Sequence, residues 1–177
     1  MRQAHVVFID QYGIEGMCRA GRIARAAGSA VVGGFDCIDW PRVDELCGLV
    51  DHLIVDAALA QRLTDCSNPA EAALRLLRGN QRDRQVVVVT CGAAGSWWVS
   101  VDQQTPVHQP AVAVAVVDTT GCGDVFRGAY MVALVRGLPP AERVRLASAA
   151  AAVKATRPGG QRGCPTWEEL QGFLQNA

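Results

Sequence analysis

One stretch of the sequence decides the fold: Asp118-Thr119-Thr120-Gly121-Cys122-Gly123-Asp124-Val125-Phe126-Arg127-Gly128-Ala129. It follows a strand-like run and opens a helical pattern, so its small residues 121–123 are expected at the start of a helix. The first amide groups of a helix have no partner within the helix, and the helix dipole makes that end positive. The stretch therefore predicts a binding site for an anion such as phosphate.

Asp124 is expected in the first turn of this helix, beside the predicted anion site. A carboxylate repels phosphate, but it is well placed to take a proton from a hydroxyl group that attacks a phosphoryl group. The alternative interpretation is that Asp124 only interacts favourably with the helix dipole.

Two common phosphate motifs do not fit the stretch. A P-loop requires Gly-Lys-Ser/Thr, and the stretch contains no lysine. The dinucleotide fingerprint requires glycine at the position that Phe126 occupies. A Rossmann-type oxidoreductase is therefore disfavoured.

Toward the N-terminus, short apolar runs alternate with helical patterns. The runs typical of buried strands are residues 5–9, 30–32, 52–55 and 86–89, of which the second is expected to stop at Gly33-Gly34. The helical patterns run from Ile14 to a closing Gly28, from a capping Asp39 to Gly48, and onward from Asn68. This alternation predicts a mainly parallel sheet covered on both faces by helices.

The pattern changes after Thr90. Residues 96–101 and 107–117 resemble strands joined by turns, which indicates antiparallel additions to the sheet. Helices are expected over about 123–136, from Pro139-Pro140 to Arg157, and after the capping box Thr166-Trp167-Glu168-Glu169. The whole chain, 1–177, is interpreted as one α/β domain, a three-layer αβα sandwich.

Composition excludes several classes of function. The 177 residues carry 17 basic and 17 acidic side chains, so zero net charge gives no reason to expect nucleic acid or a membrane as partner. Lys154 is the only lysine, which we attribute to base composition. Seven scattered cysteines form no C-x-x-C pair, and no signal peptide or membrane span is recognised. A cytoplasmic protein is expected.

The stretch 118–129 resembles the C-terminal signature of the ribokinase family, the phosphofructokinase-B type carbohydrate kinases, with Cys122 in place of the usual alanine. The Ala-rich helix that leads into Thr156-Arg157-Pro158-Gly159-Gly160 is also similar to the family, as is the strand 86–89 with the turn 90–95. The resemblance implies a partial ribokinase-like fold. It also implies transfer of phosphate from ATP to a hydroxyl group of a sugar or sugar-like substrate.

The resemblance assigns roles to individual positions. Asp124 matches the catalytic base, and the anion hole matches Gly121, Cys122 and Gly123. An activating monovalent cation, normally potassium, would be bound near Asp118 and Thr120 together with backbone carbonyls of 158–163. The loop that contacts ATP matches Thr90, Gly92 and Gly95, although the last two glycines also suit a simple turn.

Two features depart from the family. The Asn-x-x-Glu motif that organises Mg²⁺ is replaced by Asp56-Ala57-Ala58-Leu59. The N-terminal half, which brings the sugar-contacting residues and the lid, is absent, so residues 5–9 would form an exposed edge strand. We therefore expect a fragment of a longer protein, or a homodimer or other partner that covers this edge. A non-catalytic nucleotide-binding module remains the alternative.

Cys122 carries a separate hypothesis. A thiol at a helix N-terminus is expected to have a lowered pKa, which would favour its oxidation and block the anion hole. The alternative is that Cys122 is only a small residue in place of alanine. His5, His52 and His108 are scattered and receive no catalytic role.

Overall fold

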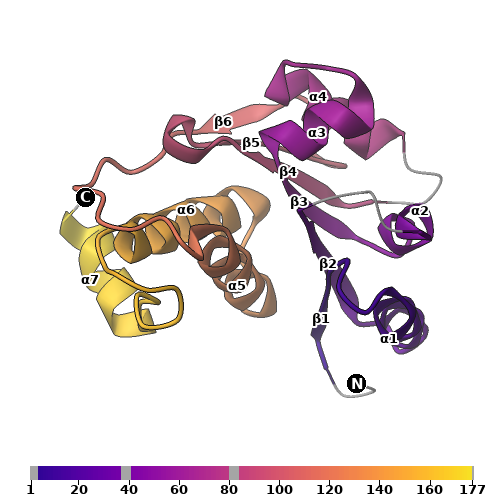
Figure 1. Ribbon diagram of the computed structural model, residues 1–177, viewed down its shortest axis with the longest axis horizontal. Coiled ribbons are helices and arrows are strands. Elements are labelled where there is room, and N and C mark those ends of the chain that lie inside the picture. Colours follow the sequence, from indigo (N-terminus) through magenta and orange to yellow (C-terminus); the bar gives the residue numbers. More distant parts are fainter. Residues whose placement is uncertain (1–3, 37–40, 80–83, 177) are drawn as a thin grey trace. The chain divides into compact units, whose positions relative to one another are not determined.

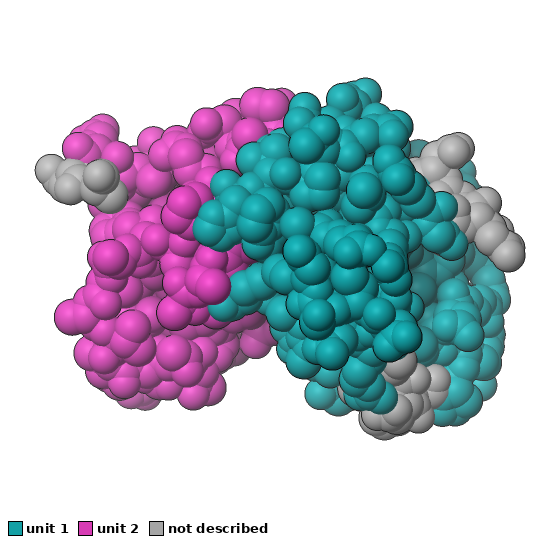
Figure 2. Space-filling view, turned by 90° about the horizontal axis from the view of Figure 1, so that it is seen from above, with its two compact units in different colours: residues 1–91, 97–108 teal, residues 92–96, 109–177 magenta. Residues whose placement is uncertain are grey.

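The computed structural model describes residues 4–36, 41–79 and 84–176. The chain forms two compact units, one of residues 1–91 with 97–108 and the other of residues 92–96 with 109–177 (Figure 2). No helix within the described residues is long and apolar enough to cross a bilayer.

The first unit is built on the sheet. Over the described residues, its six strands lie in the order β1-β2-β3-β4-β5-β6 (Figure 1): β1 (Val6–Ile9), β2 (Ala30–Phe35), β3 (His52–Asp56), β4 (Val86–Thr90), β5 (Ser96–Ser100) and β6 (Val107–Gln109). Strands β1 to β4 pair in parallel, with Val7 opposite Val31 and Leu53 opposite Val87. The Val101 amide donates to the Gln85 carbonyl at 3.0 Å, which joins the end of β5 to the start of β4 as an antiparallel neighbour requires. The mixed α/β class with a mostly parallel sheet is confirmed.

In the described part of this unit, one face of the sheet is covered by the helices α1 (Ile14–Ala26), α2 (Val43–Cys47), α3 (Ala57–Thr64) and α4 (Pro69–Arg78) (Figure 1). Alternate strand residues such as Phe35, Val87 and Val89 join one buried apolar cluster with residues of all four helices. The predicted cap of α4 is present, because the Asn68 side chain accepts from the Ala70 and Glu71 amides.

As far as it is described, to Asn176, the second unit contains the helices α5 (Cys122–Val135), α6 (Pro140–Ala155) and α7 (Trp167–Asn176), after a short 3₁₀ turn, η1 (Gly92–Ala94). Small buried residues of α6, including Ala149 and Ala150, pack in an apolar cluster with Val125 and Ala133 of α5. The predicted capping box opens α7, with the Thr166 amide 2.8 Å from Glu169 Oε2 and the Glu169 amide 3.2 Å from Thr166 Oγ1.

Strand β2 does not stop at Gly33-Gly34 as expected, but continues to Phe35. Gly33 and Gly34 pair in register with Leu53 and Ile54 of β3, so the ladder runs through them. A Cβ on Gly33 would lie 2.5 Å from Val50 Cγ2. The glycine therefore makes room for a packed side chain and is not a strand terminator.

The expected strand over 107–117 was also wrong beyond Gln109. Pro110 has no amide hydrogen to donate to a ladder. At the far end, the Val117 and Asp118 amides both donate to the Ala155 carbonyl, at 2.8 and 3.1 Å. The segment is thus bonded to the end of α6 and leads directly into α5.

Two helix starts differ from expectation. Helix α3 was not predicted, and it begins because the Asp56 side chain accepts from the Leu59 amide at 2.7 Å. Asp39, the expected cap of the next helix upstream, lies outside the described residues. Helix α2 begins at Val43, later than expected. It ends before Gly48, as expected.

Candidate active site

The start of α5 requires a glycine at position 121. Gly121 is the N-cap with φ of +78°, a left-handed conformation that a side chain would strain. A Cβ there would also lie 3.2 Å from the Cα of Gly160, in the loop after α6. The Gly121 carbonyl accepts from the Val125 amide at 2.9 Å, which closes the first turn. Two glycines thus bring the loop before α5 against the loop after α6.

The first turn of α5 presents free amide groups. The Cys122 amide donates to the Thr119 carbonyl at 3.1 Å. Among the residues that the structure describes, the Gly123 and Asp124 amides have no acceptor. Apart from its chain neighbours and the backbone of α5 itself, no described atom lies within 4 Å of a Cβ placed on Gly123, so the space beside it is open. This arrangement can accept an anion.

The Asp124 side chain lies at the same helix end and is 80% exposed. Its Oδ1 is 3.4 Å from the Arg127 guanidinium, at the outer limit of a hydrogen bond. Asp124 also lines a pocket of about 630 Å³ in this unit, whose walls include Thr120, Val132 and Trp167. A reactant in this pocket can therefore reach the carboxylate, which has the exposure that a proton acceptor needs.

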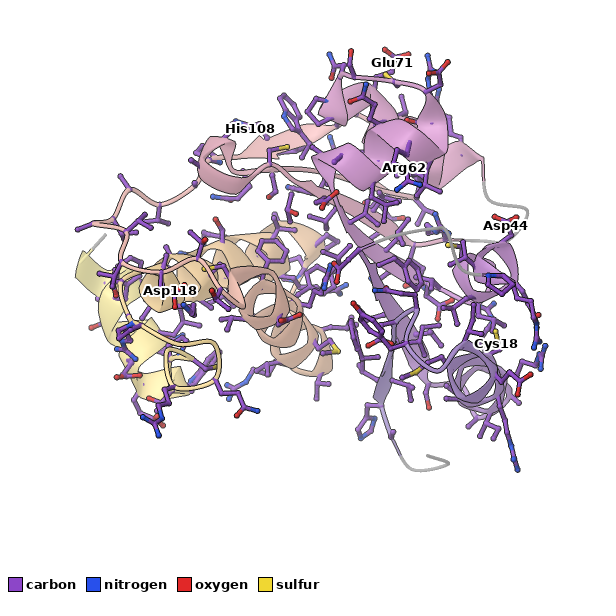
Figure 3. The ribbon with its side chains drawn as sticks, in the orientation of Figure 1. Cys18, Asp44, Arg62, Glu71, His108 and Asp118 are labelled. Atoms are coloured by element: carbon purple, nitrogen blue, oxygen red, sulfur yellow. The ribbon has the colours of Figure 1, made fainter. Side chains whose placement is uncertain are left out.

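Asp118, in the loop before α5, links two loops of the second unit (Figure 3). Its Oδ1 accepts from the Thr120 amide and its Oδ2 from the Gly159 amide, both at 2.8 Å. The bond from Thr120 is the main reason that the pKa of Asp118 is lowered to about 2, with help from Gly159. The carboxylate is therefore ionised throughout the neutral range.

Lys154 is the residue of this region that sequence reasoning missed. It lies on α6, is fully buried, and its Nζ donates to the main-chain oxygens of Asp118 at 2.8 Å and Arg157 at 3.2 Å. The same Nζ is 3.8 Å from Asp118 Oδ2. A single lysine within an Ala-rich helix was the available signal, because a charge is almost never buried unless it is paired.

The proposed ATP-loop residues each have a clear local role. Thr90 ends β4, and its hydroxyl donates to the Val55 carbonyl at 3.4 Å. Gly92 and Gly95 have φ of +57° and +88° at either end of η1. A Cβ on Gly95 would lie 2.7 Å from the Ala111 amide nitrogen. The turn chemistry alone therefore accounts for both glycines.

The expectation for the Cys122 thiol was wrong. Its Sγ lies 3.6 Å from the Ala151 carbonyl of α6, and burial raises its pKa. Desolvation by burial outweighs the nearby Lys154 ammonium group, which acts to lower the pKa, and the Asp118 carboxylate raises the pKa further. The six cysteines in the described part of the chain are all free thiols.

Asp56, at the position of the missing Asn-x-x-Glu motif, uses one carboxylate oxygen to cap α3. The described residues include no cluster of three or more His, Cys, Asp or Glu side chains that is suited to a metal ion.

Comparison with known proteins identifies relatives of this chain. The profile of the pfkB family carbohydrate kinase matches residues 6–167. Ribokinase of Haemophilus influenzae is 30% identical over 136 residues, which are 76% of this chain and 44% of that protein. Mouse ribokinase is 36% identical over 110 residues, which are 61% of this chain and 33% of that protein.

Solved structures agree with this. Arabidopsis thaliana ribokinase complexed with ribose and ATP superposes with a TM-score of 0.88 at 26% identity, over 98% of this chain and 57% of that chain. Ribokinase from Thermotoga maritima gives a TM-score of 0.78 at 27% identity, over 97% of this chain and 57% of that one. The chain spans slightly more than half the length of these two structures, and less than half of the two relatives matched by sequence.

Proposed function

The chain belongs to the pfkB family of carbohydrate kinases, and we propose that it carries the phosphate-binding and catalytic part of an ATP-dependent sugar kinase. The observation that supports this most strongly is the start of α5, where free Gly123 and Asp124 amides adjoin an exposed Asp124 carboxylate. The solved Arabidopsis relative, which holds ribose and ATP, supports the same substrate classes.

In the proposed reaction, Asp124 takes the proton from a sugar hydroxyl group as its oxygen attacks the γ-phosphorus of ATP. A bond forms between the sugar oxygen and the γ-phosphorus, and the bond from that phosphorus to the bridging oxygen breaks, which releases ADP. The proton stays on the Asp124 carboxylate until solvent removes it. The exposure of this side chain on the pocket is what permits that role.

The proposed anion hole consists of Gly121, Cys122 and Gly123. The Cys122 amide already donates to the Thr119 carbonyl. Among the described residues, the free donors are therefore the Gly123 and Asp124 amides. Gly121 contributes through its left-handed conformation, which turns the chain into the helix. Donors that are fixed before the reaction stabilise charge as it develops on the transferred group.

The remaining ATP contacts are proposed at Thr90, Gly92 and Gly95, by resemblance to the family. Mg²⁺ is proposed to enter with ATP, where it would offset the charge of the phosphate oxygens during phosphoryl transfer. No step is assigned to the Asn-x-x-Glu position, where this chain has Asp56-Ala57-Ala58-Leu59.

Potassium is the other cofactor that the resemblance implies, at Asp118 and Thr120. The Asp118 oxygens that would bind the ion already accept hydrogen bonds. The main-chain carbonyl accepts from Lys154, and the carboxylate accepts from the amides of Thr120 and Gly159. The residues present therefore do not fit a potassium ion, and no step of the reaction passes through one.

The residues assigned above do not include any that read the sugar, and the matched relatives are longer than this chain. A second copy of the chain, or another partner at the edge of the sheet, is proposed to complete the sugar site. Within the described residues, strand β1 is the edge of the sheet and offers its outer backbone groups to such a partner.

The test is release of ADP from Mg-ATP by the purified chain over a panel of pentoses, hexoses and nucleosides. Release that depends on one sugar supports the kinase and names its substrate. A folded chain that binds ATP but releases no ADP with any sugar would instead favour the non-catalytic nucleotide-binding module. A parallel assay compares the binding of ATP with that of NAD. A preference for NAD would contradict both the kinase and the nucleotide-binding module.

A further inference from the structure

Lys154 lies where the resemblance implies a monovalent cation. Its Nζ donates to the Asp118 main-chain oxygen at 2.8 Å and to the Arg157 oxygen at 3.2 Å. Asp118 Oδ2 is 3.8 Å away, too far for a hydrogen bond but close enough for charge pairing. These groups lie at or beside the expected cation ligands, Asp118 and the carbonyls of 158–163. An ammonium group supplies the same single positive charge as a potassium ion, together with three directed donors.

The loop after α6 is built around this side chain. A Cβ on Gly163 would lie 3.0 Å from Lys154 Cε and 2.9 Å from the Gly159 carbonyl oxygen. Any other residue at position 163 would thus press on the lysine stem. The side chain is fully buried, so its charge is excluded from water and must be satisfied by the protein oxygens around it.

The Lys154 ammonium group connects the parts of the anion site. It holds Asp118, whose carboxylate in turn binds the amides of Thr120 and Gly159. Thr120 precedes Gly121, which packs on Gly160. The hydrogen bonds of the Lys154 ammonium group therefore connect the end of α6 and the loop after it to the segment that leads into α5.

We propose that the Lys154 ammonium group permanently replaces the activating potassium ion, so that this chain holds its anion hole in shape without any monovalent cation. Lys154 is a positioning residue in this account, because it acts through Asp118 and the loop and does not reach the reacting atoms. The consequence for catalysis rests on the proposed function, whereas the consequence for ion binding and stability does not.

The experiment compares thermal unfolding in potassium chloride with that in tetramethylammonium chloride at equal ionic strength, for the wild-type chain and two variants. Lys154→Ala opens the space and leaves the oxygens unpaired, whereas Lys154→Met keeps the volume of the stem without the charge. We expect the wild-type chain and Lys154→Met to show no difference in Tm between the salts. Lys154→Ala should gain a saturable, potassium-specific rise of about 2–4 °C.

Each outcome decides the proposal. A saturable potassium-specific rise in the wild-type Tm would overturn it, because a separate ion site would then exist. Equal Tm values in both salts for Lys154→Ala would also overturn it. If Lys154→Ala is unfolded in tetramethylammonium, refolding in potassium supports the proposal, and failure to refold in either salt counts against it. None of these readouts needs kinase activity, so failure of the proposed function is detected separately.

Discussion

The Cα of Gly160 would lie 3.2 Å from a Cβ on Gly121, so these two glycines pack backbone against backbone. The contact places the loop after α6 beside the first turn of α5, where the free amides and Asp124 lie. Two segments that are distant in the sequence therefore form the anion site, and its shape depends on small residues and on hydrogen bonds between loops.

Gly121→Ala should destabilise the chain by about 1–3 kcal/mol, because alanine is strained at a φ of +78° and its Cβ meets Gly160. Denaturant unfolding measures this change, and calorimetry should show weaker ATP binding. The matched control is Gly16→Ala within α1, where a Cβ meets no atom within 4 Å. That control should be neutral or stabilising by up to about 1 kcal/mol. Equal effects of the two substitutions would show that the Gly121 contact has no special importance.

Asp118 should make the stability of the chain depend on acid pH. Its pKa is lowered from 3.8 to about 2 in the folded chain, so the folded state favours the charged form. The resulting stabilisation is complete above the unfolded pKa near 4 and is lost as the pH falls through about 2. Asp118→Asn should therefore lower the free energy of unfolding at pH 7 and flatten its decline between pH 4 and 2. Parallel curves for wild type and variant across that window would contradict this.

Cys122 should react slowly with thiol reagents at neutral pH. Burial raises its pKa, so little thiolate is present, whereas Cys164 has an exposed side chain. Mass spectrometry of the chain after brief iodoacetamide treatment at pH 7 should find label on Cys164 before Cys122. ATP affinity should be unchanged in Cys122→Ala. Preferential labelling of Cys122 would revive the hypothesis of an oxidation-sensitive anion hole.

The sequence allowed prediction of the elements whose signals are local. The run Val86–Val89 forms a buried strand, and Thr166 with Glu169 forms the capping box that opens α7. The start of α5 followed from small residues and helix geometry alone.

Errors arose where a distant partner decides the outcome. Gly33 resembles a strand terminator until Val50 is known to pack over it. Residues 110–117 have the apolar content of a strand, but their last amides bond to Ala155 at the end of α6. Lys154 was overlooked because only the folded structure brings its side chain to the Asp118 carbonyl, 36 residues away.

Asp124, at the start of α5, is the proposed base for phosphoryl transfer, and the isosteric variant Asp124→Asn tests this role most directly. The measurement is the rate of sugar-dependent ADP release beside ATP affinity, for wild type and variant under the same conditions. We expect ATP affinity to be retained and the rate to fall by about 10²–10⁴-fold, because the amide cannot take up the proton. A variant that keeps the wild-type rate would contradict the account.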